Sequence, residues 1–392
     1  MRRSGDRILT THVGSLPRPV ELDDAFERRT EDPRAYDSAL RRAVTDVVVR
    51  QLRTGVDVVN DGEFGKSSWA GYISERLGGF EARPMPPGTS LLAGKDFEDF
   101  AEYYAYALRT GTMWHTPDGR LRAPVPMPQW VCTGPIAYTG LSALQQDIDN
   151  LKSALRGTEG TEAFLPVAAP ASIEAGRVNE HYASDEAFVY ALAEALKVEY
   201  DGIAEAGLLV QVDDAFIPFN HDRLLAQGMS KQEYLKHSQM RIEALNHALR
   251  DVPEDRVRYH ICWGSWHGPH STDVPLRDIV ELMLMVKAQA YLFEAANVQH
   301  EHEYHIWERV KLPAGKILVP GVVSHATNVL EHPALVAERI GRFVARVGRE
   351  NVMAGTDCGL GGRVHPQLAW AKLKVLAEGA TLASDVRHVV AV

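Results

Sequence analysis

A histidine and two cysteines carry the chemistry that this sequence suggests most directly. His260 and Cys262 stand in the run YHICWGSWHGPH (259–270), and Cys358 stands in AGTDCGLGGR (354–363). Residues two apart on a strand point to the same side, so this imidazole and this thiol should lie next to each other. Two neighbouring ligands cannot close a tetrahedral Zn²⁺ site alone. The sequence therefore predicts a zinc site that a distant residue completes, with Cys358 as the first candidate.

A second segment competes for the metal. The run QHEHEYH (299–305) places His300 and His302 beside Glu301 and Glu303, and these side chains would ligate a cation if the segment were extended. It leads instead into the helix-like HIWERVK, so we expect its side chains to be solvated or to hold the metal ligands from outside. The third cysteine, Cys132, lies in the apolar run QWVCTGP and is expected in the core.

The elements that must position these residues alternate along the whole chain. Short apolar runs are separated by helical patterns, which is typical of βα units around a parallel sheet. Nine runs qualify as strands: residues 9–15, 56–63, 129–135, 164–172, 208–216, 257–264, 290–297, 317–324 and 351–359. Because a closed barrel of this kind has eight strands, we predict an α/β fold, a (β/α)8 TIM barrel, with one run outside the ring or only lining its mouth.

Helical patterns, with apolar residues three and four apart, fill most of the intervals between these runs. They cover residues 37–53, 185–206, 231–250, 276–286, 333–347 and 366–378. No repeat, low-complexity tract or flexible linker divides the chain, so residues 1–392 are predicted to form a single catalytic domain.

Residues 82–128 interrupt this alternation of predicted strands and helices. They contain several prolines and the aromatic, helix-like run DFEDFAEYYAYAL (96–108), and they exceed the length of an ordinary βα loop. We expect a long insertion that acts as a lid over the barrel mouth, as a contact between copies of the chain in a homo-oligomer, or as a surface excursion.

The composition limits the partners. The chain has a net charge of −10, and no basic stripe is able to neutralise phosphates, so we expect a small-molecule substrate and no nucleic acid. No apolar stretch is long enough to span a membrane, and the N-terminus does not resemble a secretory signal. The expected location is the cytoplasm, where an odd and sparse set of cysteines is available for metal binding.

Polar side chains collect where the predicted strands end. They are Gly14, Ser15, Asp61, Glu63, Thr133, Asp213, Asp214, His260, Cys262, Glu294, Asn297, His325, Asn328, Asp357 and Cys358. In a parallel barrel the C-terminal ends of the strands meet at one mouth, where active sites of this fold lie. The sequence therefore predicts an open, catalytic metal site at that mouth rather than a closed structural one.

These motifs resemble, in matching order along most of the chain, the C-terminal catalytic barrel of the cobalamin-independent methionine synthases. HVGSLPRP looks like the family's substrate-carboxylate loop, NDGEF like its acidic strand end, and CTGP like its Thr-Gly-Pro turn. QVDDAF looks like the strand whose aspartate holds the substrate amine. HIC is similar to the family's zinc pair, and TDCGL is similar to the segment that supplies the last cysteine.

The resemblance implies a role for each matched residue. It makes His260, Cys262, Glu294 and Cys358 zinc ligands, and a site with two thiolates and one carboxylate would carry a formal charge of about −1, which keeps a bound thiolate nucleophilic. It implies that Glu63 and Asp213 bind a substrate ammonium and that the backbone around Ser15 binds a carboxylate. His325 looks like the family's mobile active-site histidine, which would protonate the leaving group.

Several of these residues also have a purely structural interpretation. Glu63 and Asp213 would then cap the helices that follow them, although Asp61 and Asp214 fit that role better. His325 would be a satisfied polar residue at the start of a helix. Glu294 is preferred to Glu301 as a ligand because it ends an apolar strand that points at the mouth.

The expected function is that of a zinc-dependent thiol alkyltransferase, with methyl transfer to homocysteine or a related thiol as the first expectation. The donor stays open between a folate, another small methyl compound and a partner corrinoid protein. Complete synthases of the family use a first barrel to help hold the folate, and this chain has only one barrel. The run GSWHGPH (264–270) also departs from those synthases and would reshape the pocket beside the metal.

Two alternatives remain. Single-barrel proteins resembling the epoxyalkane:coenzyme M transferases add a thiol to an epoxide, and they would need a cation for the sulfonate. Arg18 and Arg363 are the cations nearest the motifs. The other alternative is a non-catalytic zinc-binding barrel, and an absence of metal would favour a metal-free decarboxylase on a related barrel.

Overall fold

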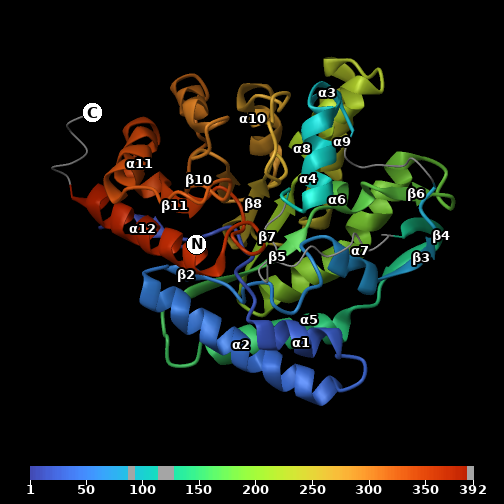
Figure 1. Cartoon of the computed structure of the whole chain (residues 1–392), viewed down its shortest axis with the longest axis horizontal. Helices are drawn as coiled ribbons and strands as arrows, with labels where there is room; N and C mark the ends of the chain where they lie inside the picture. The colour runs from blue at the N-terminus through green and yellow to red at the C-terminus, as the bar shows by residue number, and fades with distance from the viewer. Residues whose placement is uncertain (87–92, 114–127, 386–392) are drawn as a thin grey trace.

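The computed structural model describes residues 1–86, 93–113 and 128–385. Eight parallel strands follow one another in the order β1-β11-β10-β9-β8-β7-β5-β2 (Figure 1). Their bounds are β1 Leu9–Thr10, β2 Val58–Val59, β5 Glu162–Ala168, β7 Leu209–Asp214, β8 Val257–Ile261, β9 Ala290–Phe293, β10 Ile317–Val323 and β11 Met353–Thr356. Beside β2, the amide of Asp57 donates to the carbonyl of Thr10 at 3.0 Å and brings the two edges together. The predicted (β/α)8 TIM barrel is confirmed.

The ninth predicted strand lies outside the barrel. It is β4 (Gln129–Tyr138), which pairs antiparallel with β3 (Leu77–Arg83) and parallel with β6 (Arg177–Asn179) in a separate three-stranded sheet, called the outer sheet below. Its apolar residues have a packing role there, because Val131 and Cys132 are buried. The core position predicted for Cys132 is therefore confirmed.

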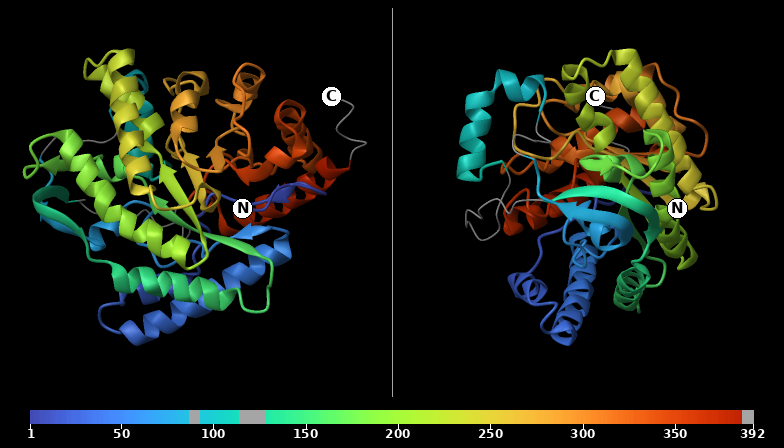
Figure 2. Two further views of the ribbon diagram at one scale, coloured as in Figure 1. Left: turned by 180° about the vertical axis from the view of Figure 1, so that it is seen from behind. Right: turned by 90° about the vertical axis from the view of Figure 1, so that its right-hand side faces the viewer.

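Helices surround the barrel, and all six predicted helical stretches are present. The helices are α1 Val20–Glu27, α2 Pro33–Thr54, α3 Lys95–Asp99, α4 Ala101–Thr110, α5 Leu141–Ala154, α6 Pro170–Glu174, α7 Asp185–Glu205, α8 Phe216–Ala226, α9 Lys231–Ala248, α10 Leu276–Met285, α11 Pro333–Val347 and α12 Pro366–Ser384. In Figure 2, α2 (blue) and α12 (red) lie on the outside of the strands. No helix among the described residues is both long and apolar enough to cross a membrane.

Local signals in the sequence explain where the longer helices begin and end. The side chain of Asp32 accepts a hydrogen bond from the amide of Ala35, Pro33 occupies the first turn, and Gly55 ends α2 in the left-handed conformation. Ser230 and Glu233 form a reciprocal capping box at the start of α9. Such caps fix the ends of the helices and hence the loops that connect them to the barrel.

The interior of the barrel is largely apolar and also holds a buried arginine. A compact cluster fills it, made of Leu9, Val13, Val58, Phe164, Leu209, Ala290, Leu292, Ile317, Val319 and Met353. Arg258 is fully buried, and its guanidinium stacks 3.9 Å above the ring of Phe164. It also donates to the Thr11 hydroxyl at 2.9 Å and to the His12 carbonyl at 3.0 Å. This arginine therefore supports, from inside the barrel, the strand that leads into the 12–19 loop.

The predicted insertion, residues 82–128, contributes the end of β3 and the helices α3 and α4, while its residues 87–92 and 114–127 lie outside the described residues. Helix α3 lies beside α8, where the amide of Asp96 donates to the Asp222 carboxylate at 3.0 Å (Figure 1). Tyr104 of α4 packs with Met113 and with Trp266, a residue of the loop that follows β8. The insertion thus packs against that loop, and its role as a lid stays a prediction.

Candidate functional site

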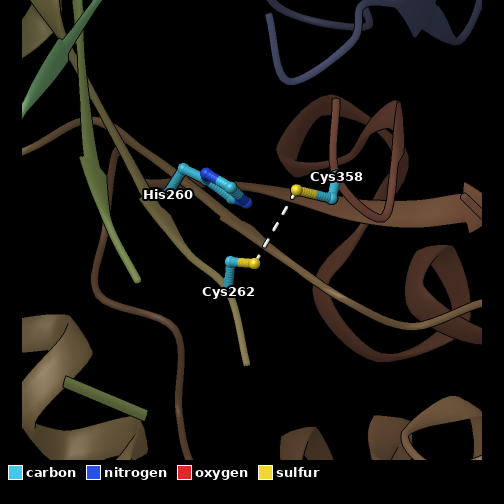
Figure 3. Close-up of side chains that lie close together, drawn as sticks. All are labelled: His260, Cys262 and Cys358. Atoms are coloured by element: carbon cyan, nitrogen blue, oxygen red, sulfur yellow. Dashed lines mark hydrogen bonds between the residues drawn. The ribbon is translucent and has the colours of Figure 1, made fainter. Parts of the chain in front are cut away.

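The C-terminal ends of β8 and β11 bring three of the four predicted metal ligands together. His260 is the fourth residue of β8, Cys262 follows the strand directly, and Cys358 lies two residues beyond β11. One ligand atom from each of the three lies within 4.8 Å of the other two. Figure 3 shows the imidazole and both sulfur atoms pointing toward one another.

The geometry of this group fits a tetrahedral metal ion. The two sulfur atoms lie 3.7 Å apart, and both cysteines are free thiols. Zn–S distances of about 2.3 Å in a tetrahedral site would separate two sulfurs by about 3.8 Å. Nε2 of His260 is buried without a hydrogen-bond partner among the described residues, so its lone pair is available. A mixed sulfur and nitrogen set of this kind suits Zn²⁺.

A hydrogen bond joins the two thiols, and either sulfur can be its donor. This contact, together with burial, raises the pKa of Cys262 well above its usual range. The same hydrogen bond lowers the pKa of Cys358, and His260 and Arg363 nearby add to the effect. The amide of Gly264 also donates to the sulfur of Cys262 at 3.2 Å. One thiolate is therefore already stabilised in this group, and thiolates are the form that binds metal.

Asp213 at the end of β7 holds the ring of His260. Its Oδ1 atom lies 2.9 Å from Nδ1 of His260 and accepts a second hydrogen bond from Gln211 at 3.0 Å. An imidazole that gives its Nδ1 proton to a carboxylate presents Nε2 to a metal. The register of the barrel creates this contact, because Asp213 and His260 are direct partners across β7 and β8.

Glu294, the predicted fourth ligand, lies at the end of β9 and is buried. Its Oε1 atom accepts the amide of Trp263 at 3.0 Å, and its Oε2 atom accepts the side-chain amide of Asn297 at 2.6 Å. The carboxylate falls into a second, adjacent group of potential ligands with His325 and Asp357. Each oxygen keeps a lone pair for a cation, so the role of Glu294 as a ligand stays a prediction.

Side chains of the alternative metal-binding segment, residues 299–305, make other contacts. His300 lies between Asp273 at 3.1 Å and Glu303 at 2.8 Å, and its ring lies against Trp263 with centroids 4.1 Å apart. Glu301 forms ion pairs with Arg339 and Arg342 on α11. Within the described part of the chain, neither His300 nor Glu301 belongs to a group of potential metal ligands.

Glu63 stands beside this centre in a backbone conformation that is rare for its residue type. Its φ of 61° lies in the left-handed region, and its carboxylate occupies the space that a side chain on Gly14 would need. Burial, and then the nearby charge of Asp213, raise the pKa of Glu63 to about 8. No hydrogen bond among the described residues uses Oδ2 of Asp213. The two carboxylates are therefore placed to share a cationic group.

The loop around Ser15 joins the acidic strand end to the cysteine segment. The carbonyl of Ser15 accepts the amides of Leu360 at 2.9 Å and Gly361 at 3.0 Å. The amide of Leu16 donates to the carbonyl of Gly62 at 3.2 Å. The amide of Ser15 has no acceptor among the described residues, which leaves it available to a carboxylate, the role predicted for this loop.

His325 follows β10 and is almost completely buried. Its Nδ1 atom has no hydrogen-bond partner in the described part of the chain. Burial, and then the positive charge of Arg363, hold the pKa of His325 well below its usual range. The imidazole is therefore neutral and can act as a hydrogen-bond donor through one ring nitrogen only.

The carboxylates predicted as structural have structural contacts. Asp61 accepts the amide of Glu63 at 2.9 Å and shapes the turn. Asp214 accepts the hydroxyls of Tyr259 at 3.0 Å and Ser172 at 3.2 Å. These hydrogen bonds hold the backbone on either side of Glu63 and Asp213.

Arg363 is the residue whose importance the sequence showed least. Its Nε atom donates to the hydroxyl of Ser265 at 2.6 Å. Burial lowers the pKa of Arg363, while the charges of Cys358 and Cys262 oppose that effect, so the guanidinium interacts electrostatically with both thiols. Arg18 instead donates to the Lys66 carbonyl at 2.6 Å and holds the turn after Glu63. Arg363 is thus the cation that faces the centre.

The second half of the 259–270 run forms an aromatic wall. The ring of Trp266 stacks on His270 with centroids 4.1 Å apart, and its indole N–H donates to the Tyr104 hydroxyl at 3.1 Å. His270 has a φ of 54° and pairs with Asp273, which also contacts His300. The sequence predicted that this run would reshape the pocket beside the metal but not this His–Asp–His chain, because its members are brought together only by the loop.

A family model described as the catalytic domain of cobalamin-independent synthase matches residues 8–85 and 168–381. The interval it leaves, 86–167, contains most of the insertion and the strand β4. Methionine synthase from Saccharolobus solfataricus is 24% identical over 384 residues, which cover 94% of this chain and 93% of that protein. A 2-hydroxypropyl-CoM lyase from Xanthobacter autotrophicus is 22% identical over 408 residues and covers 95% of this chain and 94% of its own length.

Solved structures share the fold. The B12-independent methionine synthase from Shewanella sp. W3-18-1, in complex with selenomethionine, superposes with a TM-score of 0.68 at 17% identity. The superposition covers 96% of this chain and 97% of that one. A vitamin-B12-independent methionine synthase structure from Listeria monocytogenes gives a TM-score of 0.66 at 18% identity, with coverage of 96% and 98%.

Proposed function

This chain belongs to the family of cobalamin-independent synthase catalytic domains, enzymes of methyl and alkyl transfer to thiols, and we propose that it alkylates a thiol held at the His260–Cys262–Cys358 centre. The observation that carries the proposal is the convergence of this sulfur and nitrogen group with two carboxylates at one end of the barrel. Residues 1–392 would act as one catalytic barrel, and methyl transfer to homocysteine or a related aminothiol is the reaction we propose first.

His260, Cys262 and Cys358 would hold Zn²⁺, with Glu294 as the fourth ligand. A cation in this place supplies the charge that lowers the pKa of a substrate thiol and makes it a nucleophile near neutral pH. Asp213 keeps Nε2 of His260 directed at the ligand position through the hydrogen bond to Nδ1.

Glu63 and Asp213 would bind the ammonium group of the thiol substrate. Asp213 keeps Oδ2 for this purpose, and Glu63 gains a positive neighbour that favours its charged form. The amide of Ser15 would donate to the substrate carboxylate. Binding the ammonium and carboxylate groups of the substrate in this way orients its sulfur atom before the reaction.

His325 would deliver the proton that alkyl transfer requires when the leaving atom is nitrogen or oxygen. The carbon–sulfur bond forms as the bond from carbon to the leaving atom breaks, and the neutral imidazole donates its N–H proton to that atom. Its burial keeps water away from the reacting groups. With a corrinoid protein as donor, the leaving metal centre needs no proton and His325 would only shape the pocket.

The lengths of the relatives show whether a single barrel is compatible with methyl transfer. The Saccharolobus methionine synthase is matched over 93% of its length by this chain, so a protein bearing that name has no room for a second barrel. A single barrel of this length is therefore compatible with methyl transfer. We leave the donor between a folate, another small methyl compound and a corrinoid protein.

Arg363 favours a second candidate function. A guanidinium beside the two sulfurs would suit a thiol with a sulfonate group, as in the addition of coenzyme M to an epoxide, and one relative is a 2-hydroxypropyl-CoM lyase. In that reaction the sulfur attacks an epoxide carbon, the ring C–O bond breaks, and the alkoxide takes a proton. Glu63 and Asp213 count against it, because both would repel a sulfonate.

A mass-spectrometric screen separates these candidates. The purified protein is incubated with homocysteine or coenzyme M, each with 5-methyltetrahydrofolate, methylcobalamin or an epoxyalkane. We expect methionine from homocysteine, and loss of that product in Cys262→Ser. Formation only of a hydroxyalkyl thioether of coenzyme M would replace the first proposal with the second. Absence of bound metal, together with full activity of Cys262→Ser, would refute both.

A further inference from the structure

A separate cavity lies between α6, α8, α9 and the outer sheet, on the right-hand side of Figure 1. Its volume is about 320 Å³, and three arginines line it: Arg177 of β6, Arg223 of α8 and Arg241 of α9. No predicted metal ligand or substrate-binding residue borders it. Helix α8 stands between the two sites, because Phe219 packs on Trp266 while Arg223 lines the cavity.

Two of the three arginines form no ion pair among the described residues. Arg241 forms a forked ion pair with Glu174, in which its Nε lies 2.6 Å from the carboxylate. Arg177 donates only to the carbonyl of Ile173 and to the hydroxyl of Ser74. Nε of Arg223 is buried with no hydrogen-bond partner, and no ion pair in the described part of the chain includes Arg177 or Arg223.

This arrangement is unusual in a chain with a net charge of −10. The cavity lining contains three arginines and two carboxylates, Glu174 and Asp185, which leaves an excess of one positive charge. Burial lowers the pKa of Arg177 to about 10 and also lowers that of Arg223. Guanidinium groups that lose water without gaining an anion destabilise the fold, and an anionic ligand would reverse that cost.

The remaining lining offers further polar groups to such a ligand. His237 is neutral, because burial and then Arg241 lower its pKa to about 4, so one of its ring nitrogens donates and the other accepts. Oδ1 of Asn220 is buried without a partner among the described residues. The cavity therefore combines unpaired cations with unused side-chain hydrogen-bonding groups.

We propose that this cavity binds a small oxyanion with at least two negative charges, a di- or tricarboxylate or a phosphate ester, between Arg177 and Arg223. Guanidinium groups match carboxylate and phosphate oxygens through paired hydrogen bonds, and a single charge would leave one arginine without an anion. The volume is within the range of small-molecule pockets, about 300–1,000 Å³. The site lies outside the proposed thiol centre, and its existence does not depend on thiol transfer.

Isothermal titration calorimetry on the full-length protein tests this site, with citrate and inorganic phosphate as probes and chloride at equal ionic strength as the reference. We expect saturable binding of at least one probe, at one site per chain. Arg223→Gln should weaken it at least tenfold. Arg42→Gln removes the same charge from an exposed position on α2 and should change nothing. Cys262→Ser should also bind the probe normally, which separates this site from citrate bound at the metal.

Chemical modification of the wild-type protein gives a readout that survives a poorly folding variant. Phenylglyoxal labelling of Arg177 and Arg223, mapped by peptide mass spectrometry, should slow when the bound probe is present. Binding of citrate alone would identify a polycarboxylate site, and binding of phosphate alone a phosphate site. Absence of saturable binding and of protection by both probes, or unchanged binding in a folded Arg223→Gln protein, would overturn the proposal.

Discussion

The Nδ1 atom of His260 lies 2.9 Å from Oδ1 of Asp213. The sequence assigned Asp213 to the substrate and His260 to the metal, and the structure connects the two assignments through one carboxylate. Asp213 has one oxygen bonded to the candidate metal ligand and one oxygen that faces away from it. A change at this residue should therefore affect both metal binding and substrate binding.

Asp213→Asn should weaken zinc binding, whereas Glu63→Gln should not. Loss of a carboxylate that orients a ligating histidine typically costs about 10–100-fold in metal affinity. Glu63 makes no contact with His260, so its substitution should raise only the Kd for homocysteine, by about 10–100-fold for one charged hydrogen bond. Zinc competition with a chromophoric chelator, beside thiol binding by calorimetry, provides the comparison. Equal zinc affinity in Asp213→Asn and wild type would show that Asp213 does not support metal binding through His260.

The purified protein should contain one zinc per chain. Cys262→Ser and Cys358→Ser should each lose most of it, because the hydroxyl is a poorer ligand for this soft nitrogen and sulfur site. Cys132→Ser serves as the control, since Cys132 is buried in strand β4 of the outer sheet and belongs to no group of potential metal ligands among the described residues. Elemental analysis of the three variants is the measurement. Full zinc content in both ligand variants would refute the proposal that Cys262 and Cys358 bind zinc.

Trp266→Ala should impair substrate selection more than chemistry. The indole joins Tyr104 of α4 to His270, so its removal detaches the insertion from the loop after β8. We expect a higher KM for the thiol, a weaker preference between thiols and a nearly unchanged kcat. Tyr106→Ala, on the exposed face of α4, should behave like wild type. A large fall in kcat with unchanged KM would argue that the wall acts in the reaction itself.

Arg76 should be essential for stability rather than for activity. Its guanidinium is buried and pairs with Asp147 at 2.6 Å and Glu199 at 2.7 Å. Arg76→Met would leave two buried carboxylates without a counter-charge, a change that costs about 3–5 kcal/mol. Arg83→Met removes an exposed ion pair between the end of β3 and Glu180, which follows β6, and should have no measurable effect. Urea unfolding of the two variants measures the difference in the free energy of unfolding.

Acid should destabilise the barrel partly through His12. Burial lowers the pKa of His12 to about 4, although its hydrogen bond to Gln51 opposes this. Between that value and about 6.5, the unfolded chain binds a proton that the folded chain excludes, so the free energy of unfolding falls as pH falls, by up to about 3 kcal/mol. Unfolding in urea at pH 7 and pH 5 should therefore show a smaller pH dependence in His12→Gln. Identical slopes in variant and wild type would exclude His12 as the cause.

Much of the fold could be predicted because it depends on local patterns. Apolar runs of strand length, helical spacing and polar strand ends together indicated a parallel barrel, and all eight strands were among the nine runs. The sequence could not show that 129–138 lies outside the ring. An apolar run such as QWVCTGP is buried equally well by a barrel or by the outer sheet, so only the tertiary pairing distinguishes them.

The candidate site, like the fold, could be predicted only where it depends on local patterns in the sequence. His260, Cys262 and Cys358 could be predicted from strand periodicity and position, and the structure brings them together. The contact between Asp213 and His260 depends on the register of β7 against β8, which no local pattern specifies. Arg363 reaches the thiols through the conformation of the loop after Cys358. Sequence reasoning could place that arginine near the motif but not beside the sulfurs.

The backbone at Glu63 also bears on how this barrel can change. A residue with a side chain at a φ of 61° costs about 1–2 kcal/mol relative to glycine, and its carboxylate is buried beside another acid. Selection for heat resistance alone would therefore replace Glu63 with glycine and gain stability at once. A descendant that no longer binds its substrate should acquire glycine at this position. The residue at position 63 should therefore indicate whether a barrel of this kind still binds that substrate.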